Sequence, residues 1–166
     1  MAKKEVATLA GGCFWGMEDL LRKVPGYLNS DVGYTGGTVH NATYEQVKTG
    51  KTGHAEAIQI EFDPETLTYE NLLLFFFKIH DPTTVEQQGN DIGSQYRSAI
   101  FYHTDAQRKT AEQVIERVNK SNAWGAPVAT QLEPVDSFYR AEDYHQDYLE
   151  KHPNGYTCHF LRDIKF

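Results

Sequence analysis

The chain has 166 residues, enough for one compact domain with a buried core, so we expect residues 1–166 to form a single domain. Hydrophobic residues make up 40% and charged residues 23%, close to ordinary globular composition. Lys and Arg together number 16 against 23 Asp and Glu, and the formal charge of -7 repels phosphate backbones, which argues against a nucleic-acid partner.

The apolar runs are too short to cross a bilayer, and the most apolar of them spans only residues 72–79. The N-terminal residues lack the apolar core and cleavage motif of a secretory signal. We therefore expect a cytoplasmic protein without a membrane partner. In that reducing compartment the two cysteines, Cys13 and Cys158, are not expected to form a structural disulfide framework; they are more often inert, metal-binding or catalytic.

The first half of the chain alternates strand and helix patterns. A short apolar strand ends at Gly11-Gly12, and helical spacing follows until Pro25-Gly26 stops it. Thr68 is a suitable N-cap for a later helix, with Asn71 at its third position. The expected elements are strands over 5–10, 31–35 and 54–63, and helices over 14–24 and 68–80.

The second half begins with a polar stretch, 83–97, that reads as a loop. The expected elements after it are strands over 97–104 and 127–135, and helices over 105–121 and 141–153. The helix over 105–121 is clearly amphipathic, and its inward positions are expected to be Ala106, Ala111, Val114, Ile115 and Val118. The pattern predicts an α+β fold, a two-layer sandwich of helices on a mostly antiparallel or mixed sheet, with long loops around 35–53 and 81–97.

Cys13 falls at the turn between the first strand and the first helix. A lone cysteine beside large rings is often a small core residue. A helix N-terminus, however, presents unpaired N–H groups and the positive end of the helix dipole, which stabilise a thiolate. Gly11 and Gly12 permit a tight turn and close approach of a substrate. The position therefore favours a nucleophile over an inert thiol.

Phe14 and Trp15 follow Cys13 directly. Adjacent helical residues point about 100° apart, so both rings are hard to bury in one core. We expect at least one of them to line a surface hollow beside the thiol. A thiolate beside aromatic walls suits a small apolar group that carries a polar atom, and sulfur and methyl groups pack well against rings.

Several further polar residues lie in the loops and strands around this turn. Glu56 shares a predicted strand face with Ile58 and Ile60, so either the predicted register is wrong or Glu56 is a buried acid. A buried acid has a raised pKa and can donate a proton near neutrality. Tyr44 and Tyr96 carry hydroxyl groups in the two long loops. Asp91 lies in the second loop and is as readily explained as a turn residue.

The chain contains three motifs in this order: GGCFWG at 11–16, GHAE at 53–56 and GNDIGSQYRS at 89–98. With these motifs it resembles the A-type peptide methionine sulfoxide reductases, which reduce the S-epimer of methionine sulfoxide. YEQVKTGKTGHAE and EDYHQDYLEKHPNGY are also similar to segments of that family. The resemblance runs from Lys4 to Arg162. It implies a catalytic domain with a ferredoxin-like plait at its centre and long coil segments, acting in the repair of oxidative damage.

The resemblance also implies residue roles. Cys13 would attack the sulfoxide sulfur and become a sulfenic acid, with Phe14 and Trp15 holding the S-methyl group. Glu56 would protonate the sulfoxide oxygen, Tyr44 and Tyr96 would donate hydrogen bonds to it, and Asp91 would order the site. Cys158 would resolve the sulfenic acid as a disulfide, although a structural role for it in the C-terminal segment stays open.

The partners follow from the same resemblance. Free methionine sulfoxide or oxidised proteins would be the substrate, and thioredoxin, or dithiothreitol in vitro, the reductant of a monomeric enzyme. No cofactor and no metal would be required.

Two other classes stay open at this stage. A cysteine hydrolase or transferase would use Cys13 with His54 as its base and would not need Cys158. A binding module would use the same fold without chemistry. A metal site has weaker support, because the histidines lack a common ligand spacing near a cysteine, and His159 is expected to be a solvated or packing residue.

Overall fold

A six-stranded sheet organises the computed structural model, which describes residues 4–89, 91–155, 157 and 159–166. The strand order is β7-β6-β1-β3-β2-β8, and neighbouring strands are antiparallel except β6 and β7, which are parallel. The strands are β1 (Glu5–Gly11), β2 (Tyr27–Thr35), β3 (Ala55–Phe62), β6 (Ser98–Tyr102), β7 (Gln131–Pro134) and β8 (Phe138–Arg140). Two short strands, β4 (Gln87–Gln88) and β5 (Asp91–Ile92), pair separately.

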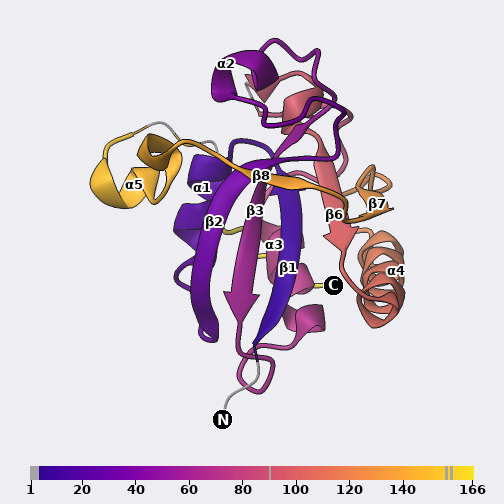
Figure 1. Ribbon diagram of the computed structural model, residues 1–166. Coiled ribbons are helices and arrows are strands. Elements are labelled where there is room, and N and C mark those ends of the chain that lie inside the picture. Colours follow the sequence, from indigo (N-terminus) through magenta and orange to yellow (C-terminus); the bar gives the residue numbers. More distant parts are fainter. Residues whose placement is uncertain (1–3, 90, 156, 158) are drawn as a thin grey trace.

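The helices are α1 (Phe14–Leu21), α2 (Tyr44–Val47), α3 (Tyr69–Ile79), α4 (Asp105–Ser121) and α5 (Tyr148–Lys151), with 3-10 turns at Ser94–Tyr96 and Asp143–His145. Figure 1 shows α1 and α3 behind the sheet, α4 beside β6 and β7, and β8 curling across the front. The fold is therefore a mixed α/β arrangement around a curled sheet. Within it, the run β1-α1-β2-β3-α3-β6 supplies four adjacent strands in the order β6-β1-β3-β2.

The main hydrophobic core lies between the sheet and these helices. Alternation along β3 sends Ile58, Ile60 and Phe62 into this core, and Phe14 and Phe76 meet them from α1 and α3. The opposite side of β3 contributes Ala55 and Ala57 to a smaller cluster, against which Phe138 packs. Because the sheet is covered on both faces in this region, a side chain on β3 near Ala55 is removed from water whichever way it points.

The strongly periodic elements agree with the sequence predictions. Helix α4 spans 105–121 as expected, and α3 begins after Thr68, whose hydroxyl accepts the N–H of Asn71 at 3.1 Å. β1, β3 and β6 match their predicted ranges to within two residues at each end, while β2 begins four residues earlier than expected. Within the part of the chain that the structure describes, there is no helix long and apolar enough to cross a membrane.

The sequence predictions were wrong mainly for short helices and strands. The predicted loop 83–97 contains β4, β5 and a 3-10 turn, and the loop 35–53 contains α2, whose capping box joins Thr43 and Gln46. Helix α1 ends at Leu21 rather than Val24, and the strand predicted over 127–135 is reduced to β7. β8 had no counterpart in the prediction. These segments are too short to show a period in sequence.

The helix predicted over 141–153 is wrong as a continuous element. The chain instead forms a 3-10 turn, an extended residue at Gln146, a left-handed residue at Asp147 with φ of 53°, and then α5. The Gln146 side chain accepts the Val32 N–H at 2.8 Å and donates to the Val32 carbonyl at 2.9 Å. These contacts with β2 replace the helical hydrogen bonds, so a tertiary interaction overrides the helical pattern.

One inward position of α4 was also wrong. Ala106 is exposed, and Gln107 is buried in its place. The Gln107 amide donates to the Val6 carbonyl at 2.8 Å and accepts the His103 N–H at 2.9 Å. A polar side chain therefore points inward because it joins the start of the helix to β1.

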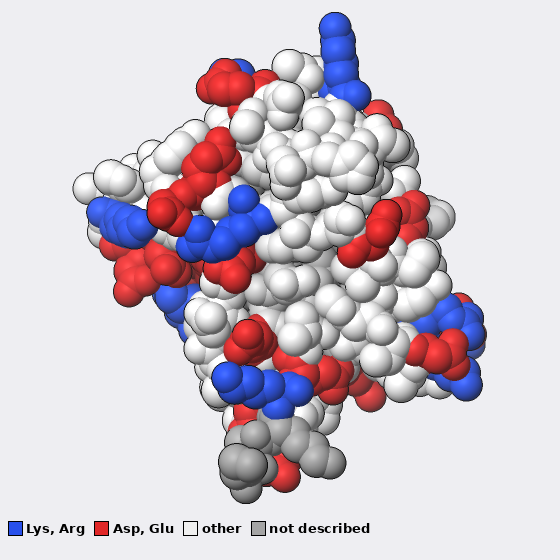
Figure 2. Space-filling model, viewed as in Figure 1, with Lys and Arg blue, Asp and Glu red and all other residues white. Residues whose placement is uncertain are grey.

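Charged side chains of both signs adjoin on the face shown in Figure 2, in separate groups around a broad uncharged area. Elsewhere in the described chain, several ion pairs join residues three or four positions apart, such as Arg108 with Asp105 and Lys120 with Glu116. Exposed pairs of this kind contribute little to stability.

Candidate active site

Cys13 occupies the N-cap position of α1, two residues after β1 ends. Its side chain is nearly buried, with 7% of its surface exposed. Gly12 adopts φ of 98°, a left-handed conformation that favours glycine and turns the chain from strand into helix. The predicted strand-to-helix turn therefore places the thiol at the positive end of the helix dipole.

Glu56 lies on β3 with its carboxyl group against the first turn of α1. Its Oε1 accepts the Phe14 N–H at 3.3 Å, one of the N–H groups that a helix start leaves unpaired. Only 2% of Glu56 is exposed, and this burial raises its pKa to about 8, against a smaller opposing effect of the Phe14 hydrogen bond. The carboxyl group is therefore mostly protonated at neutral pH.

Glu56 interacts electrostatically with Tyr44 on α2, with Tyr96 in the 3-10 turn 94–96 and with Asp91 on β5. Burial, followed by the negative charges of Glu56 and Cys13, raises the pKa of Tyr44 to about 12. Burial and the charges of Glu56, Tyr44 and Asp91 likewise raise the pKa of Tyr96. Asp91 adds to the raised pKa of Glu56. The predicted residues thus lie within electrostatic range of one another, and both phenols keep their protons at neutral pH.

Phe14 and Trp15 separate as the helical geometry requires. Phe14 is buried and its ring centroid lies 5.8 Å from that of Tyr34, whereas Trp15 is half-buried. Trp15 stacks on Tyr148 with centroids 3.8 Å apart and donates its indole N–H to His145 Nδ1 at 2.9 Å. Trp15 is therefore the ring that reaches the surface beside the thiol.

His145, Tyr148 and Glu142 were not predicted as site residues. Glu142 accepts the Tyr34 hydroxyl at 2.9 Å and the Tyr44 backbone N–H at 3.1 Å, so it holds the start of α2 in place. All three belong to the segment EDYHQDYLEKHPNGY, whose resemblance to the family was the one signal that could have singled them out.

Cys158 lies outside the described residues. Its chain neighbours Thr157 and His159 pack against α1: a side chain at Gly16 would collide with Thr157 Oγ1 and His159 Nδ1. His159 is buried, and its Nε2 lies 2.6 Å from the Gly11 carbonyl oxygen, which makes it a packing histidine rather than a solvated one. The C-terminal segment is thus attached to the turn that carries Cys13.

His54 is not placed to activate Cys13. Its Nδ1 accepts the Gly37 N–H at 3.0 Å, and its Nε2 lies 2.7 Å from the Val39 carbonyl oxygen. Both ring nitrogens therefore bind the backbone of one loop, which removes the base that a cysteine hydrolase would need. Among the residues that the structure describes, no group of three His, Cys, Asp or Glu side chains is arranged to hold a metal ion.

The site therefore combines a thiol at a helix start, a buried neutral acid, two phenols that retain their protons, and an aromatic wall. Thiols attack sulfur readily as thiolates, and oxygen leaves sulfur readily once protonated. Cys13 and Glu56 supply these two requirements at the start of α1.

Comparison with known proteins agrees with this chemistry. The family model for peptide methionine sulfoxide reductase matches residues 5–165. Peptide methionine sulfoxide reductase MsrA 2 of Rhodopirellula baltica is 58% identical over 158 residues, covering 95% of this chain and 92% of the relative.

Solved structures are similar over nearly the whole chain. The reduced form of Mxr1 from Saccharomyces cerevisiae aligns with a TM-score of 0.92 at 42% identity, covering 97% of this chain and 93% of that one. Mxr1 in complex with Trx2 aligns with a TM-score of 0.67 at 33% identity, covering 97% and 91%. The chain belongs to the peptide methionine sulfoxide reductase family.

Proposed function

We propose that the chain reduces methionine-S-sulfoxide, free or in proteins, to methionine, and so repairs oxidative damage. The observation that carries the proposal is the pairing of Cys13 at the start of α1 with Glu56, a buried acid whose pKa is raised to about 8 and whose Oε1 binds the Phe14 N–H. The enzyme is an oxidoreductase that draws its electrons from thiols.

In the first step, Cys13 attacks the sulfoxide sulfur while Glu56 gives a proton to the sulfoxide oxygen. Tyr44 and Tyr96 donate hydrogen bonds to the same oxygen, and Asp91 orders the site. Two electrons pass from the Cys13 sulfur to the substrate sulfur, methionine leaves, and Cys13 carries the oxygen as a sulfenic acid. Phe14 and Trp15 form the wall against which the S-methyl group packs.

In the second step, the Cys158 thiol condenses with the sulfenic acid, forming a disulfide with Cys13 and releasing water. The attachment of Thr157 and His159 to the Cys13 turn supports Cys158 in this role. A thioredoxin dithiol then reduces the disulfide by exchange, with dithiothreitol as a substitute in vitro. The solved complex of Mxr1 with Trx2 supports this partner.

The activity is tested by supplying the two methionine sulfoxide epimers separately, with dithiothreitol as reductant. We expect turnover of the S-epimer alone. If the folded protein with free thiols reduces neither epimer, the proposal fails. Reduction of both epimers at equal rates would contradict the stereospecific site.

The resolving role is tested with Cys158→Ser. We expect one methionine per enzyme molecule in the absence of external thiol and loss of thioredoxin-driven turnover. Sustained turnover with thioredoxin would remove Cys158 from the mechanism.

We further infer that residues 1–166 act as one catalytic domain and as a monomer, which light scattering during size-exclusion chromatography measures. The order β6-β1-β3-β2, combined with the run β1-α1-β2-β3-α3-β6, supports a ferredoxin-like plait as the centre of the fold. This arrangement brings Cys13, which follows β1, and Glu56 on β3 to one end of the sheet, since β1 and β3 are antiparallel neighbours.

A further inference from the structure

The segment 145–148, which we call the strap, runs from the last residue of the 3-10 turn to the first residue of α5 and contacts Trp15 at both of its ends. His145 accepts the Trp15 indole N–H at 2.9 Å, and Tyr148 stacks on the Trp15 ring with a 12° angle between the planes. The two residues between them, Gln146 and Asp147, are bound to β2 and to α1. Both contacts with Trp15 therefore depend on how the middle of the strap is held.

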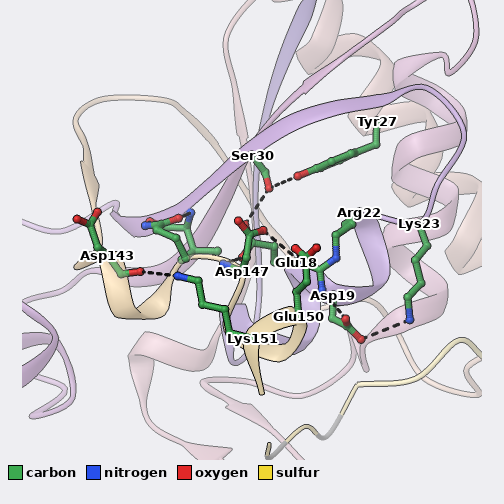
Figure 3. Close-up of polar contacts among 12 residues, drawn as sticks. Glu18, Asp19, Arg22, Lys23, Tyr27, Ser30, Asp143, Asp147, Glu150 and Lys151 are labelled. Atoms are coloured by element: carbon green, nitrogen blue, oxygen red, sulfur yellow. Dashed lines mark hydrogen bonds and ion pairs between the residues drawn. The ribbon is translucent and has the colours of Figure 1, made fainter. Parts of the chain in front are cut away.

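Glu18 holds that middle from the inner face of α1. It is 1% exposed, and its Oε1 accepts the Asp147 backbone N–H at 2.6 Å. Its Oε2 accepts the Ser30 hydroxyl at 2.8 Å, and Ser30 Oγ lies 2.7 Å from the Tyr27 hydroxyl. Figure 3 shows this chain of contacts running from β2 through Glu18 to the start of α5.

The strap needs the contact between Glu18 and the Asp147 N–H because the backbone of Asp147 is in the left-handed conformation, with φ of 53°. A non-glycine residue in this region is uncommon and persists only where its surroundings fix it. Arg22, one turn after Glu18 on α1, adds an ion pair of 3.2 Å to the Asp147 carboxylate. That ion pair is partly exposed, so the buried Glu18 contact is the stronger of the two restraints.

We propose that Glu18 is a positioning residue for substrate binding, which acts by binding the Asp147 N–H and so holding His145 and Tyr148 against Trp15. The inference rests on the proposed function, in which Trp15 forms the wall for the S-methyl group. Glu18 belongs to the same helix as Cys13 but is not part of the reacting group. Loss of the Glu18 carboxylate would loosen the contacts of His145 and Tyr148 with Trp15 and leave the Cys13–Glu56 pair in place.

The test compares Glu18→Ala with Glu18→Gln, both in a Trp124→Phe background that leaves Trp15 as the sole tryptophan. Glutamine keeps an oxygen for the Asp147 N–H, and its amide can donate to Ser30, whose hydroxyl then donates to Tyr27. The control is Glu150→Gln, which removes an exposed carboxylate facing Arg22 at 3.7 Å without touching the strap backbone.

For Glu18→Ala we expect KM for methionine-S-sulfoxide to rise about tenfold while kcat with dithiothreitol stays within about twofold, the pattern of lost uniform binding. The fluorescence emission of Trp15 should shift to longer wavelength, because His145 and Tyr148 move away from its ring and expose it to water. Glu18→Gln and Glu150→Gln should both stay close to the parent in KM and in emission.

Unchanged KM and unchanged Trp15 emission in folded Glu18→Ala would overturn the proposal. A fall in kcat at constant KM would overturn it as well, since Glu18 would then act on the chemical step. If Glu18→Ala does not fold, Ser30→Ala, which removes one of the two Glu18 contacts, should give a smaller change in the same two measurements, and no change would count against the proposal. The emission measurement requires no turnover, so it tests the strap even if the proposed activity fails.

Discussion

Burial of Glu56 raises its pKa to about 8, so the proton it would give to the sulfoxide oxygen is present at neutral pH and lost above pH 8. We expect kcat to fall about tenfold for each pH unit above this pKa, as the protonated fraction falls. Glu56→Gln retains an acceptor for the Phe14 N–H but has no acidic proton. It should lower kcat about 100- to 10,000-fold, the usual range for a general acid, and remove this alkaline decline.

The measurement is kcat for the S-epimer with dithiothreitol between pH 6 and 10, in parent and variant. Tyr44 titrates near 12 and lies outside this range. A Glu56→Gln variant that retains parental turnover, or one that keeps the decline above pH 8, would show that another group supplies the proton.

Gly16 lets the C-terminal segment pack closely against α1, because it has no side chain. A methyl group there would collide with Thr157 Oγ1 and His159 Nδ1, so Gly16→Ala should displace the C-terminal segment from α1. Misplacement by roughly 1 Å can slow a reaction about 100-fold, and we expect the resolving step to slow by about 10- to 100-fold. The first step should be less affected, because Glu56 is held at the start of α1 by the Phe14 N–H and not by the C-terminal segment.

Rapid-quench measurement of methionine and of free thiols separates the two steps. Asp19→Ala serves as the control because it also places alanine on α1, at a partly exposed position that forms an ion pair with Arg22. Equal slowing of methionine formation and thiol loss in Gly16→Ala would contradict the prediction.

Among the elements, the strap depends on Gln146 for its attachment to the sheet. Its buried amide makes hydrogen bonds to the Val32 N–H, the Val32 carbonyl and the Ala141 carbonyl. Gln146→Ala takes this partner from the buried Val32 N–H and from the Ala141 carbonyl, each at a cost of about 1–3 kcal/mol, whereas the Val32 carbonyl still accepts the Ala141 N–H at 2.8 Å. We expect the free energy of unfolding to fall by about 3 kcal/mol in urea titrations. A loss below about 0.5 kcal/mol, the range of ordinary surface changes, would show that the strap is held elsewhere.

The same contact explains which elements could be predicted from sequence. Helices α3 and α4 have long periodic faces and caps within three residues, so their local pattern decides their structure. The sequence pattern over 141–153 also predicts a helix. Gln146, however, binds Val32 on β2, 114 positions earlier in the chain. Sequence periodicity contains no information about that partner, and the predicted helix was wrong for this reason.

The site divides in the same way. Cys13 at the helix start and Glu56 on the apolar face of β3 follow from their immediate neighbours in sequence. His145 and Glu142 reach the site through contacts 130 and 98 residues apart in the chain. No local periodicity marks them, so apart from the resemblance of their segment to the family, only the fold reveals them.

For the whole molecule, buried titratable groups of two kinds set how stability varies with pH. The carboxyl groups of Glu56 and Glu18 have pKa values raised by burial to about 8 and about 6. Their contribution is complete below the unfolded pKa of 4.5 and is lost as pH rises through these values. Burial lowers the pKa of His80 to about 3 and of His159 to about 4, so their contribution is present above 6.5 and lost on acidification.

Between pH 6.5 and 8 the folded chain keeps His80 and His159 neutral and Glu18 mostly ionised, while the unfolded chain releases its remaining histidine protons in the parent and in Glu56→Gln alike. The change in the stability difference between these two proteins should therefore come mainly from Glu56. One proton changes the free energy of unfolding by at most about 1.4 kcal/mol per pH unit, giving a loss of roughly 2 kcal/mol over this interval. For a chain of this size that corresponds to a fall in Tm of about 4–8 °C. Calorimetry in a Cys13→Ser background, which prevents titration of that thiol, should show this fall as a change in the Tm difference between the parent and Glu56→Gln. A Tm difference between the parent and Glu56→Gln that stays constant from pH 6.5 to 8 would mean that Glu56 does not bind its proton more tightly in the folded chain than in the unfolded one.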